Sequence, residues 1–328
     1  MLPFSPDAPW LAPLAGWSDL PFRLLCREQG AAVCCTEMVS AKGLVYGGKN
    51  TEDLLQTADG DQPLVVQVFG AEPEFMQKAV RILKDRGFAW FDVNMGCSVP
   101  KVTKTGAGAA MLRDVPGALR VAEAVIREAG EGHCGFKLRL GWDHGHEAYL
   151  ELARALEGLG AGWVTLHPRY AVQGFSGVPR LSAIAEAVRA VSMPVLASGD
   201  LFTAEDGVRV LRETGCAAVM YARGALRDPG IFARHRDLLS GRPPAAGVPG
   251  GERVGLAGLI HRPIIRARRY APQSAFLKMR TFLPRYAKGS EGAKTLRREI
   301  IACGGWDSLE AVIDRFESGG FAYGEEDA

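Results

Sequence analysis

The stretch PVLASGDLFTAEDGVRVLRETGCAAVMYARG, residues 194–224, contains one complete unit of a pattern that repeats along the chain. An apolar run (194–200) is followed by a segment with helical spacing that begins at Thr203 and stops at Gly215, and a second apolar run (217–224) comes next. Threonine is favoured just before the first turn of a helix, and glycine just past the last turn. The unit therefore predicts a strand, a helix and a second strand.

The same pattern recurs from the start of the chain to about residue 240. Helical segments lie between the apolar runs, for example one that follows Ser18 and stops at Gly30, and one from Pro73 to Gly87. Eight strands, each followed by a helix, are typical of a (β/α)8 or TIM barrel of the α/β class. A doubly wound open sheet is the main alternative, but the count is eight and no GxGxxG follows the first run. The six runs that precede residue 194 are WLAPLAG (10–16), AVCCTE (32–37), LVVQVFG (64–70), AWFDVN (89–94), GFKLRL (135–140) and GWVTLH (162–167).

The pattern changes after residue 240. Residues 241–252 are rich in Pro and Gly, which predicts a linker between a catalytic barrel domain (1–240) and a small all-helical domain (253–328). The 328-residue chain has a formal net charge of only +2, but its charges are segregated. Residues 253–298 contain twelve Lys and Arg and one acid, a net charge of +11, whereas the rest contains 27 Lys and Arg and 36 acids, a net charge of −9.

This segregation predicts a polyanionic partner for the C-terminal part of the chain. Arg262, Arg266 and Arg269 are spaced by four and three residues, so they share one face of a helix. Acids are nearly absent around them, which is unusual for an ordinary solvated face. We therefore expect these arginines to contact the phosphate backbone of a nucleic acid.

Composition excludes several classes of protein. The chain is 47% hydrophobic and 23% charged, as in ordinary globular proteins. Its seven cysteines are odd in number and form no CxxC pair, and we interpret His144 and His146 as part of an exposed turn, so neither a disulfide framework nor a metal site is expected. The N-terminal stretch lacks a basic region followed by a long apolar one, and no apolar run approaches about 18 residues. We expect a cytoplasmic monomer without membrane segments.

In a barrel of this kind the active site lies at the carboxyl ends of the strands. Glycines and Arg223 follow the last two predicted strands, where such barrels often bind a phosphate group. Polar, basic and glycine residues that gather at one face of the barrel predict a binding pocket. The residues at or just after the strand ends are Pro13, Leu14, Ala15, Gly16, Glu37, Gln67, Asn94, Cys97, Lys137, Arg139, His167, Arg169, Ser198, Gly199, Asp200, Ala222, Arg223 and Gly224.

Several motifs at these positions resemble those of the tRNA-dihydrouridine synthases, and the similarity spans nearly all of the chain. Residues 94–102, NMGCSVPKV, are similar to the family pattern N-x-G-C-P-x-x-K-V, which a glycine-rich loop follows. Ser98 and Ser198 stand where the family commonly has Pro and Asn, and Pro168 and Ala222 stand where it commonly has Gly. The other similar motifs, in the family's order, are PLAGWSD (13–19), VQVFG (66–70), KLRLGW (137–142), HPRYAVQGFSG (167–177), SGDL (198–201) and ARGAL (222–226).

The resemblance implies an FMN-dependent enzyme that reduces the C5=C6 bond of uridines in tRNA, with NADPH or NADH as the electron donor. It implies that Cys97 is the catalytic acid and that Asn94 contacts the uracil, with Lys101, Arg139 and Arg169 also on the substrate side. It implies that the flavin is bound by two further groups of residues. Pro13, Leu14, Ala15 and Gln67 would face the flavin and Lys137 and His167 would hydrogen-bond its ring, while Ser198, Gly199, Asp200, Ala222 and Arg223 would hold its ribityl chain and phosphate.

A thiol on a glycine-rich loop suits the role of acid on chemical grounds. Hydride addition to C6 of uracil leaves negative charge on C5, which must then receive a proton from the opposite face of the ring. A thiol is protonated at neutral pH yet acidic enough to give up its proton, and the glycines of residues 104–110 allow the loop to move aside for a bulky substrate. The alternative for Cys97 is an inert buried cysteine, which is how we interpret Cys26, Cys34, Cys35, Cys134, Cys216 and Cys303.

Two other functions remain open from the sequence. An FMN-dependent barrel that reduces a small-molecule enone or pyrimidine would explain the strands and helices but not the basic segment. The other is a non-catalytic RNA-binding protein that retains the fold, and a purified protein that is yellow with bound flavin would argue against it. Trp17 and Phe175 fit either stacking on a base or packing at the rim of the barrel.

Overall fold

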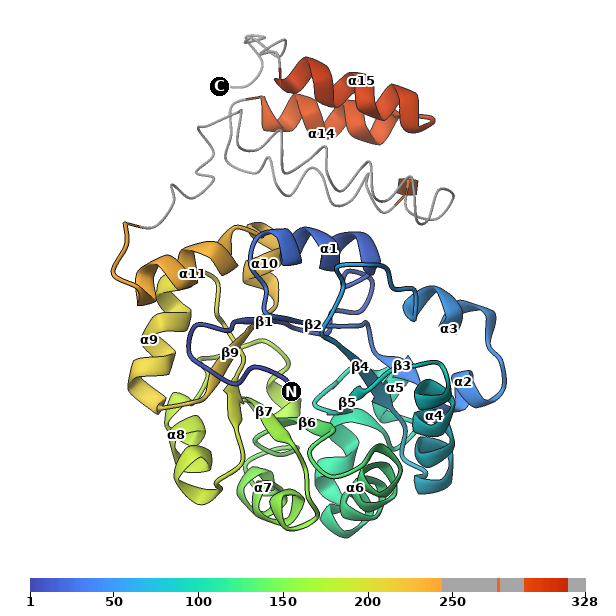
Figure 1. Ribbon diagram of the computed structural model, residues 1–328, viewed down its shortest axis with the longest axis vertical. Coiled ribbons are helices and arrows are strands. Elements are labelled where there is room, and N and C mark those ends of the chain that lie inside the picture. The colour runs from blue at the N-terminus through green and yellow to red at the C-terminus, as the bar shows by residue number, and fades with distance from the viewer. Residues whose placement is uncertain (244–275, 278–291, 318–328) are drawn as a thin grey trace.

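Eight parallel strands form a closed barrel in the computed structural model, which describes residues 1–243, 276–277 and 292–317 (Figure 1). The sheet closes because β1 pairs with both β2 and β9, and β2 also pairs with β4. The predicted (β/α)8 barrel is therefore confirmed. Its strands are β1 (Trp10–Leu11), β2 (Val33–Cys35), β4 (Leu64–Phe69), β5 (Trp90–Met95), β6 (Cys134–Arg139), β7 (Trp163–His167), β8 (Val195–Ala197) and β9 (Ala218–Tyr221).

One short strand was not predicted. β3 (Val39–Ser40) pairs in parallel with β4 and lies outside the closed ring. Two residues are too few to give an alternating pattern, and Ser40 also caps the helix α2 (Ala41–Val45) by accepting a hydrogen bond from the backbone N–H of Gly43. A strand of two residues can therefore be recognised only from its pairing with the neighbouring strand in the structure.

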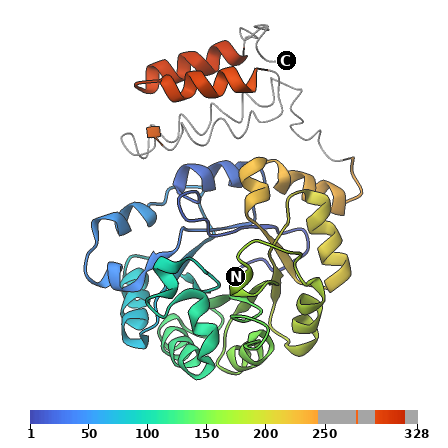
Figure 2. The ribbon, with the colours of Figure 1, turned by 180° about the vertical axis from the view of Figure 1, so that it is seen from behind.

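Helices surround the barrel on its outer side (Figures 1 and 2). The predicted helix between Thr203 and Gly215 is confirmed: the Thr203 side chain caps its first turn, and Gly215 ends it with a φ of +70°. The helix after Ser18 is capped by the next residue, Asp19. The outer helices are α1 (Leu20–Glu28), α4 (Pro73–Asp85), α6 (Val115–Ala129), α7 (Tyr149–Gly158), α8 (Leu181–Ala190), α9 (Ala204–Thr214) and α11 (Ile231–Leu239), and the shorter ones are α3 (Lys49–Leu54), α5 (Pro100–Thr103), α10 (Arg223–Arg227), η1 (Gly108–Arg113) and η2 (Ala171–Gln173).

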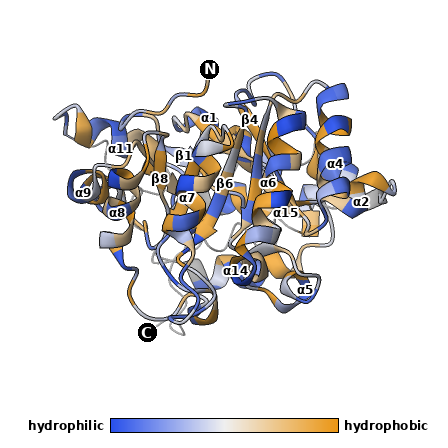
Figure 3. Cartoon of the chain, turned by 90° about the horizontal axis from the view of Figure 1, so that it is seen from below, coloured by the Kyte–Doolittle hydropathy of each residue, from blue (hydrophilic) through white to orange (hydrophobic). Residues whose placement is uncertain are grey.

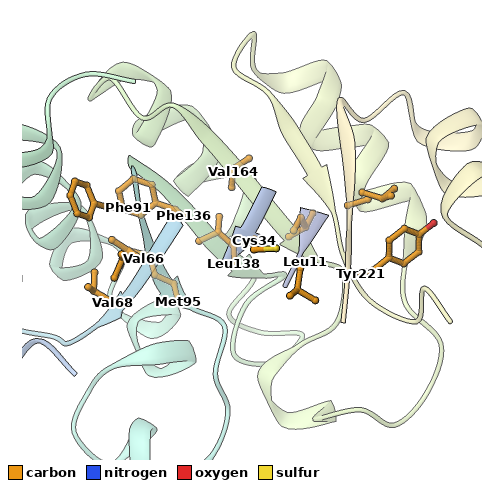
Figure 4. Packing of buried hydrophobic residues seen from close by; sticks show 14 of the residues in the cluster. Leu11, Cys34, Val66, Val68, Phe91, Met95, Phe136, Leu138, Val164 and Tyr221 are labelled. Atoms are coloured by element: carbon orange, nitrogen blue, oxygen red, sulfur yellow. The ribbon is translucent and has the colours of Figure 1, made fainter. Parts of the chain in front are cut away.

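Side chains of the strands alternate between two cores. Residues such as Val66, Phe91 and Phe136 are fully buried in the core that also includes the helices (Figure 4). The helices themselves carry both hydrophobic and hydrophilic colours in Figure 3, as expected for elements with one buried face. The second core, which includes Trp10 and Trp163, fills the inside of the barrel. Side chains two positions apart on a strand point to the same face. The residues two positions beyond this core along each strand therefore point into the mouth of the barrel.

The described part of the C-terminal region is helical. α14 (Ala293–Ala302) and α15 (Trp306–Glu317) lie side by side and bury apolar side chains such as Leu296 and Ile313. Of the twelve basic residues between 253 and 298, three lie within the described residues, and all three are exposed: Lys294, Arg297 and Arg298. Most of the predicted linker and the predicted phosphate contacts lie outside the described residues; these are residues 244–252, Arg262, Arg266 and Arg269.

Two further features concern only the residues that the structure describes. No helix among them is both long enough and apolar enough to cross a membrane. No group of three or more His, Cys, Asp or Glu side chains among them could hold a metal ion. His146 instead pairs with Asp143 at 2.8 Å, in the exposed turn where the sequence located it.

Candidate active site

A pocket of about 260 Å³ opens at the carboxyl ends of the strands. Met38, Phe175 and Phe202, among others, line it together with most of the predicted site residues. Lys101 is exposed on α5 and does not line the pocket, and Arg169 lies behind its wall. The fourteen predicted residues that the structure brings together here are Pro13, Leu14, Ala15, Gln67, Asn94, Cys97, Lys137, Arg139, His167, Ser198, Gly199, Asp200, Ala222 and Arg223.

Cys97 lies in the pocket wall, just after β5 ends. Its backbone N–H donates to Asn94 Oδ1 at 2.8 Å, and its carbonyl accepts from Ala109 N–H at 2.9 Å. Gly108, with a φ of +62°, comes so close that a Cβ there would lie 2.6 Å from this carbonyl oxygen. The Cys97 side chain is partly exposed, whereas the other six cysteines are buried. The loop therefore presents one thiol to the pocket.

A row of hydrogen bonds connects the loop to the interior of the barrel. Asn94 Nδ2 donates to Gln67 Oε1 at 2.8 Å, and Gln67 Nε2 donates to Asp92 Oδ2 at 2.6 Å. The sequence analysis missed Asp92, although an acidic residue inside the apolar run 89–94 is itself a signal, because a buried carboxylate requires partners. Asp92 is 1% exposed, and burial raises the pKa of its carboxyl group to about 6.

The strand next to β5 adds cationic side chains to the pocket, because Lys137 on β6 pairs in register with Asn94. Burial and the nearby Arg139 lower the pKa of Lys137 to about 8. Burial, together with Lys137 and neighbouring arginines, lowers the pKa of His167 to about 2, so this imidazole is neutral. Arg169 Nη1 lies 3.4 Å from His167 Nε2, and because a guanidinium can only donate, this contact favours the tautomer in which Nε2 is unprotonated. The charge on this side therefore comes from lysine and arginine.

Two buried arginines fix the loop that follows β7. Arg139 donates to the carbonyl oxygens of Gly96 at 2.8 Å and of Gly174 at 2.9 Å. Arg169 is 1% exposed, binds Asp200 with two hydrogen bonds of 2.9 and 2.6 Å, and donates to the carbonyl of Ser176 at 3.0 Å. The sequence analysis expected Arg169 on the substrate side, and this remains a prediction. In the structure its guanidinium holds Asp200 and the loop in position.

The segments after β8 and β9 form the far end of the pocket. Gly199 has a φ of +108°, and a Cβ there would lie 2.6 Å from His167 Cδ2, so the backbone approach requires glycine. Arg223 Nη2 donates to Asp200 Oδ1 at 2.7 Å, and its guanidinium lies over the rings of Phe175 and Phe202 at 4.5 and 4.9 Å. Asp200 and the two aromatic rings thus hold Arg223 in the wall of the pocket.

The chemistry of the lining residues fits an anionic ligand that carries carbonyl groups. Lys137, Arg139 and Arg223 supply positive charge, and Asp200 is the acid that lines the pocket with them. Among the described residues, no protein group hydrogen-bonds Nζ of Lys137, so this ammonium is available to a ligand acceptor. Pro13 and other apolar side chains give the pocket a surface on which a flat ring can lie.

Comparison with known proteins identifies relatives over most of the chain. Residues 10–315 match the family model described as dihydrouridine synthase (Dus). A probable tRNA-dihydrouridine synthase of Treponema pallidum is 34% identical over 314 residues, which cover 93% of this chain and 91% of the relative. The tRNA-dihydrouridine synthase B of Xanthomonas campestris is 36% identical over 222 residues, which cover 68% and 67% of the two chains.

Solved structures share the barrel at much lower identity. An old yellow enzyme homologue from Zymomonas mobilis is 13% identical with a TM-score of 0.52, over 73% of this chain and 90% of that one. A 2-naphthoyl-CoA reductase is 10% identical with a TM-score of 0.54, over 72% of this chain and 50% of that one. These likenesses establish the fold, and the family match establishes the relationship. The chain belongs to the dihydrouridine synthase family.

Proposed function

We propose that this protein is a tRNA-dihydrouridine synthase that reduces the C5=C6 bond of uridines in tRNA, with FMN as cofactor and NADPH or NADH as electron donor. The names of the curated relatives support the reaction. The observation that carries the proposal is the partly exposed thiol of Cys97 in the wall of a cationic pocket at the barrel mouth. The division of labour between a catalytic barrel (1–240) and a tRNA-binding helical domain (253–328) is part of this proposal.

The residues of the pocket fit FMN. Lys137 would meet the electron-rich edge of the ring, and the neutral His167 can donate from Nδ1. Arg223 and the backbone at Gly199 would hold the phosphate end. The apolar side chains of Pro13 and its neighbours would face the ring plane. Bound FMN supplies the hydride that the reaction adds to C6 of the uracil.

Cys97 would supply the proton that completes the reduction. The thiol holds this proton on Sγ and transfers it to C5, so that one hydride and one proton together saturate the double bond. The resulting thiolate regains a proton from solvent, to which the partly exposed side chain has access. Asn94 fixes the backbone of Cys97 through its Oδ1, and its Nδ2 can donate to a carbonyl of the base.

Basic residues outside the pocket would hold the rest of the tRNA. Lys101 lies exposed on the same loop as Cys97, where a nucleotide next to the target could reach it. Lys294, Arg297 and Arg298 are exposed on α14, and from the sequence we also assign Arg266 and Arg269 to the binding of tRNA phosphates. This assignment predicts that tRNA affinity falls with rising salt concentration.

The proposal is tested with tRNA that lacks dihydrouridine. Purified flavin-loaded protein, NADPH and this tRNA should yield tRNA in which mass mapping finds a gain of two hydrogen atoms at particular uridines. Free uridine under the same conditions should react far more slowly, because it lacks the phosphates that the basic residues bind. Equal reduction of free uridine and tRNA would instead indicate an oxidoreductase that acts on small pyrimidines.

A further inference from the structure

We infer that Asp92 is a positioning residue, because its carboxylate sets the direction of a hydrogen-bond relay that runs through Gln67 and Asn94 to the backbone of Cys97. The catalytic consequence of this inference rests on the proposed function, whereas the geometry does not. Asp92 touches neither the pocket nor the thiol and would act only through the two amides.

The relay is short and almost entirely buried. Gln67 and Asp92 are directly opposite each other on β4 and β5, and Gln67 Nε2 donates to Asp92 Oδ2 at 2.6 Å. Asn94, two residues further along the same face of β5, donates through Nδ2 to Gln67 Oε1 at 2.8 Å. Asn94 Oδ1 then accepts the backbone N–H groups of Gly96 and Cys97 at 3.1 and 2.8 Å.

The carboxylate is what gives the relay its direction. An amide side chain can turn over and exchange its oxygen for its nitrogen, but an ionised carboxylate can only accept hydrogen bonds. Asp92 therefore holds the NH2 group of Gln67 toward itself and the oxygen of Gln67 toward Asn94. At the other end of the relay, the backbone N–H groups of Gly96 and Cys97 require the oxygen of Asn94, so both ends favour the same direction. Burial raises the pKa of Asp92 to about 6, against the opposing effects of Gln67 and Lys137, so the carboxyl group is ionised at neutral pH.

The same direction determines what the pocket offers a ligand. Each amide nitrogen carries two hydrogens, and the relay uses one of them in Gln67 and one in Asn94. Both side chains line the pocket, so a ligand there can use the remaining N–H groups. The second hydrogen of Asn94 Nδ2 meets only Met38 Sδ at 3.9 Å, a weak acceptor that a ligand carbonyl would replace. Asp92 thus makes this wall of the pocket select ring carbonyl groups rather than ring N–H groups.

Alkylation of Cys97 measures the position of the loop without substrate or cofactor. The other six cysteines are buried, so iodoacetamide added to the native protein reports on Cys97. In Asp92→Asn the relay loses its fixed direction, because an amide can either donate to Gln67 or accept from it. A fraction of the molecules then turns the NH2 group of Asn94 toward Cys97 and releases the loop, and we expect alkylation to be about three to ten times faster. Asp85→Asn, which removes an exposed acid, should leave the rate unchanged.

A second substitution separates direction from packing. In Asp92→Asn/Gln67→Glu, the new carboxylate at 67 again only accepts, so Asn94 must donate to it and again accept from Cys97. The double variant should therefore be alkylated within about twofold of the wild-type rate. If Asp92 acted only by filling space, a second change beside it would leave alkylation as fast or make it faster, and this result would overturn the inference. Alkylation of Asp92→Asn at the wild-type rate would overturn it as well.

Catalysis and hydrogen exchange supply two independent measurements. In Asp92→Asn, tRNA should oxidise the reduced flavin about tenfold more slowly than in the wild type. The rate at which NADPH reduces the flavin should not change. If the wild type itself forms no dihydrouridine, the proposed function fails while the alkylation test still stands. Should Asp92→Asn not fold, the wild type decides: its Gly96 and Cys97 N–H groups should exchange at least about tenfold more slowly than that of Ser98. Equal exchange would refute the relay.

Discussion

Replacement of Lys137 by methionine should stabilise the flavin-free protein and weaken its binding of FMN. Lys137 reaches the pocket from the middle of β6, and burial lowers its pKa from an ordinary 10.5 to about 8. A cation whose pKa is lower in the folded state destabilises the fold below that pKa, and the penalty vanishes as the pH rises from about 8 to about 10.5. At about 1.4 kcal/mol per pKa unit the penalty is at most about 3.5 kcal/mol, and partial contact with solvent reduces it to about 2 kcal/mol.

Urea unfolding of the flavin-free protein measures this penalty directly. At pH 7 the free energy of unfolding of Lys137→Met should exceed that of the wild type by about 1–2 kcal/mol, because the loss of a positive charge near Asp92 offsets part of the gain. Well above pH 10.5 the two proteins should be equally stable, since Lys137 is then neutral in both the folded and the unfolded state. Lys101→Met, at an exposed position, serves as the matched control and should change stability little at either pH.

The second half of the prediction concerns the cofactor. Without the ammonium, FMN should dissociate about ten- to a hundredfold more readily, the usual contribution of a charge-assisted hydrogen bond. The reasoning is refuted if Lys137→Met is less stable than the wild type at pH 7 without flavin, because the lysine would then already be satisfied by protein groups. Unchanged FMN affinity would refute the assignment of Lys137 to the flavin edge.

Three further predictions concern other parts of the site and of the chain. Arg223→Ala should weaken FMN retention by about ten- to a hundredfold and leave the fold intact, which fluorescence titration with FMN would check; full occupancy at sub-micromolar protein would contradict it. Gly199→Ala should displace His167, whose Cδ2 the new Cβ would approach to 2.6 Å, and equilibrium binding should show weaker FMN affinity, whereas wild-type affinity would mean that the backbone yields easily. The double substitution of Arg266 and Arg269 by Glu should raise the KM for tRNA and flatten its salt dependence in steady-state assays, with flavin reduction by NADPH as the unaffected control.

The sequence predicted the barrel because each strand is an apolar run with clear boundaries. The first apolar run shows that the length of a strand is harder to predict than its presence. The run extends from residue 10 to Gly16, but the strand itself is only Trp10–Leu11. Pro13 interrupts the ladder of backbone hydrogen bonds, and the chain turns toward the pocket. β3 was missed because two residues are too few to show the alternation of apolar and polar residues that indicates a strand. Strand existence was therefore predictable, but strand length was not.

The members of the pocket were also predictable, since parallel strands bring their carboxyl ends to one face. Their partners were not. Arg169 comes after a strand just as His167 does, and nothing in the sequence distinguishes an arginine that faces a ligand from one whose guanidinium is occupied by Asp200. The relay from Asp92 depends on the register between β4 and β5, which places Gln67 opposite Asp92. The sequence alone does not give this register. Contacts between side chains on different strands require the structure.

The proposed role of Cys97 is tested most directly by a rapid-mixing experiment on Cys97→Ala. It monitors the rate at which tRNA oxidises the reduced flavin of this variant. NADPH should reduce the bound flavin at a near-normal rate in this variant, because the thiol takes no part in that step. Oxidation of the reduced flavin by tRNA should then be about 10²–10⁴-fold slower than in the wild type, the usual contribution of a positioned general acid, while tRNA binds with unchanged affinity. If tRNA oxidises the reduced flavin of the variant as fast as that of the wild type and dihydrouridine forms, Cys97 is not the acid. A lysine that follows it, Lys101 or Lys104, then becomes the candidate.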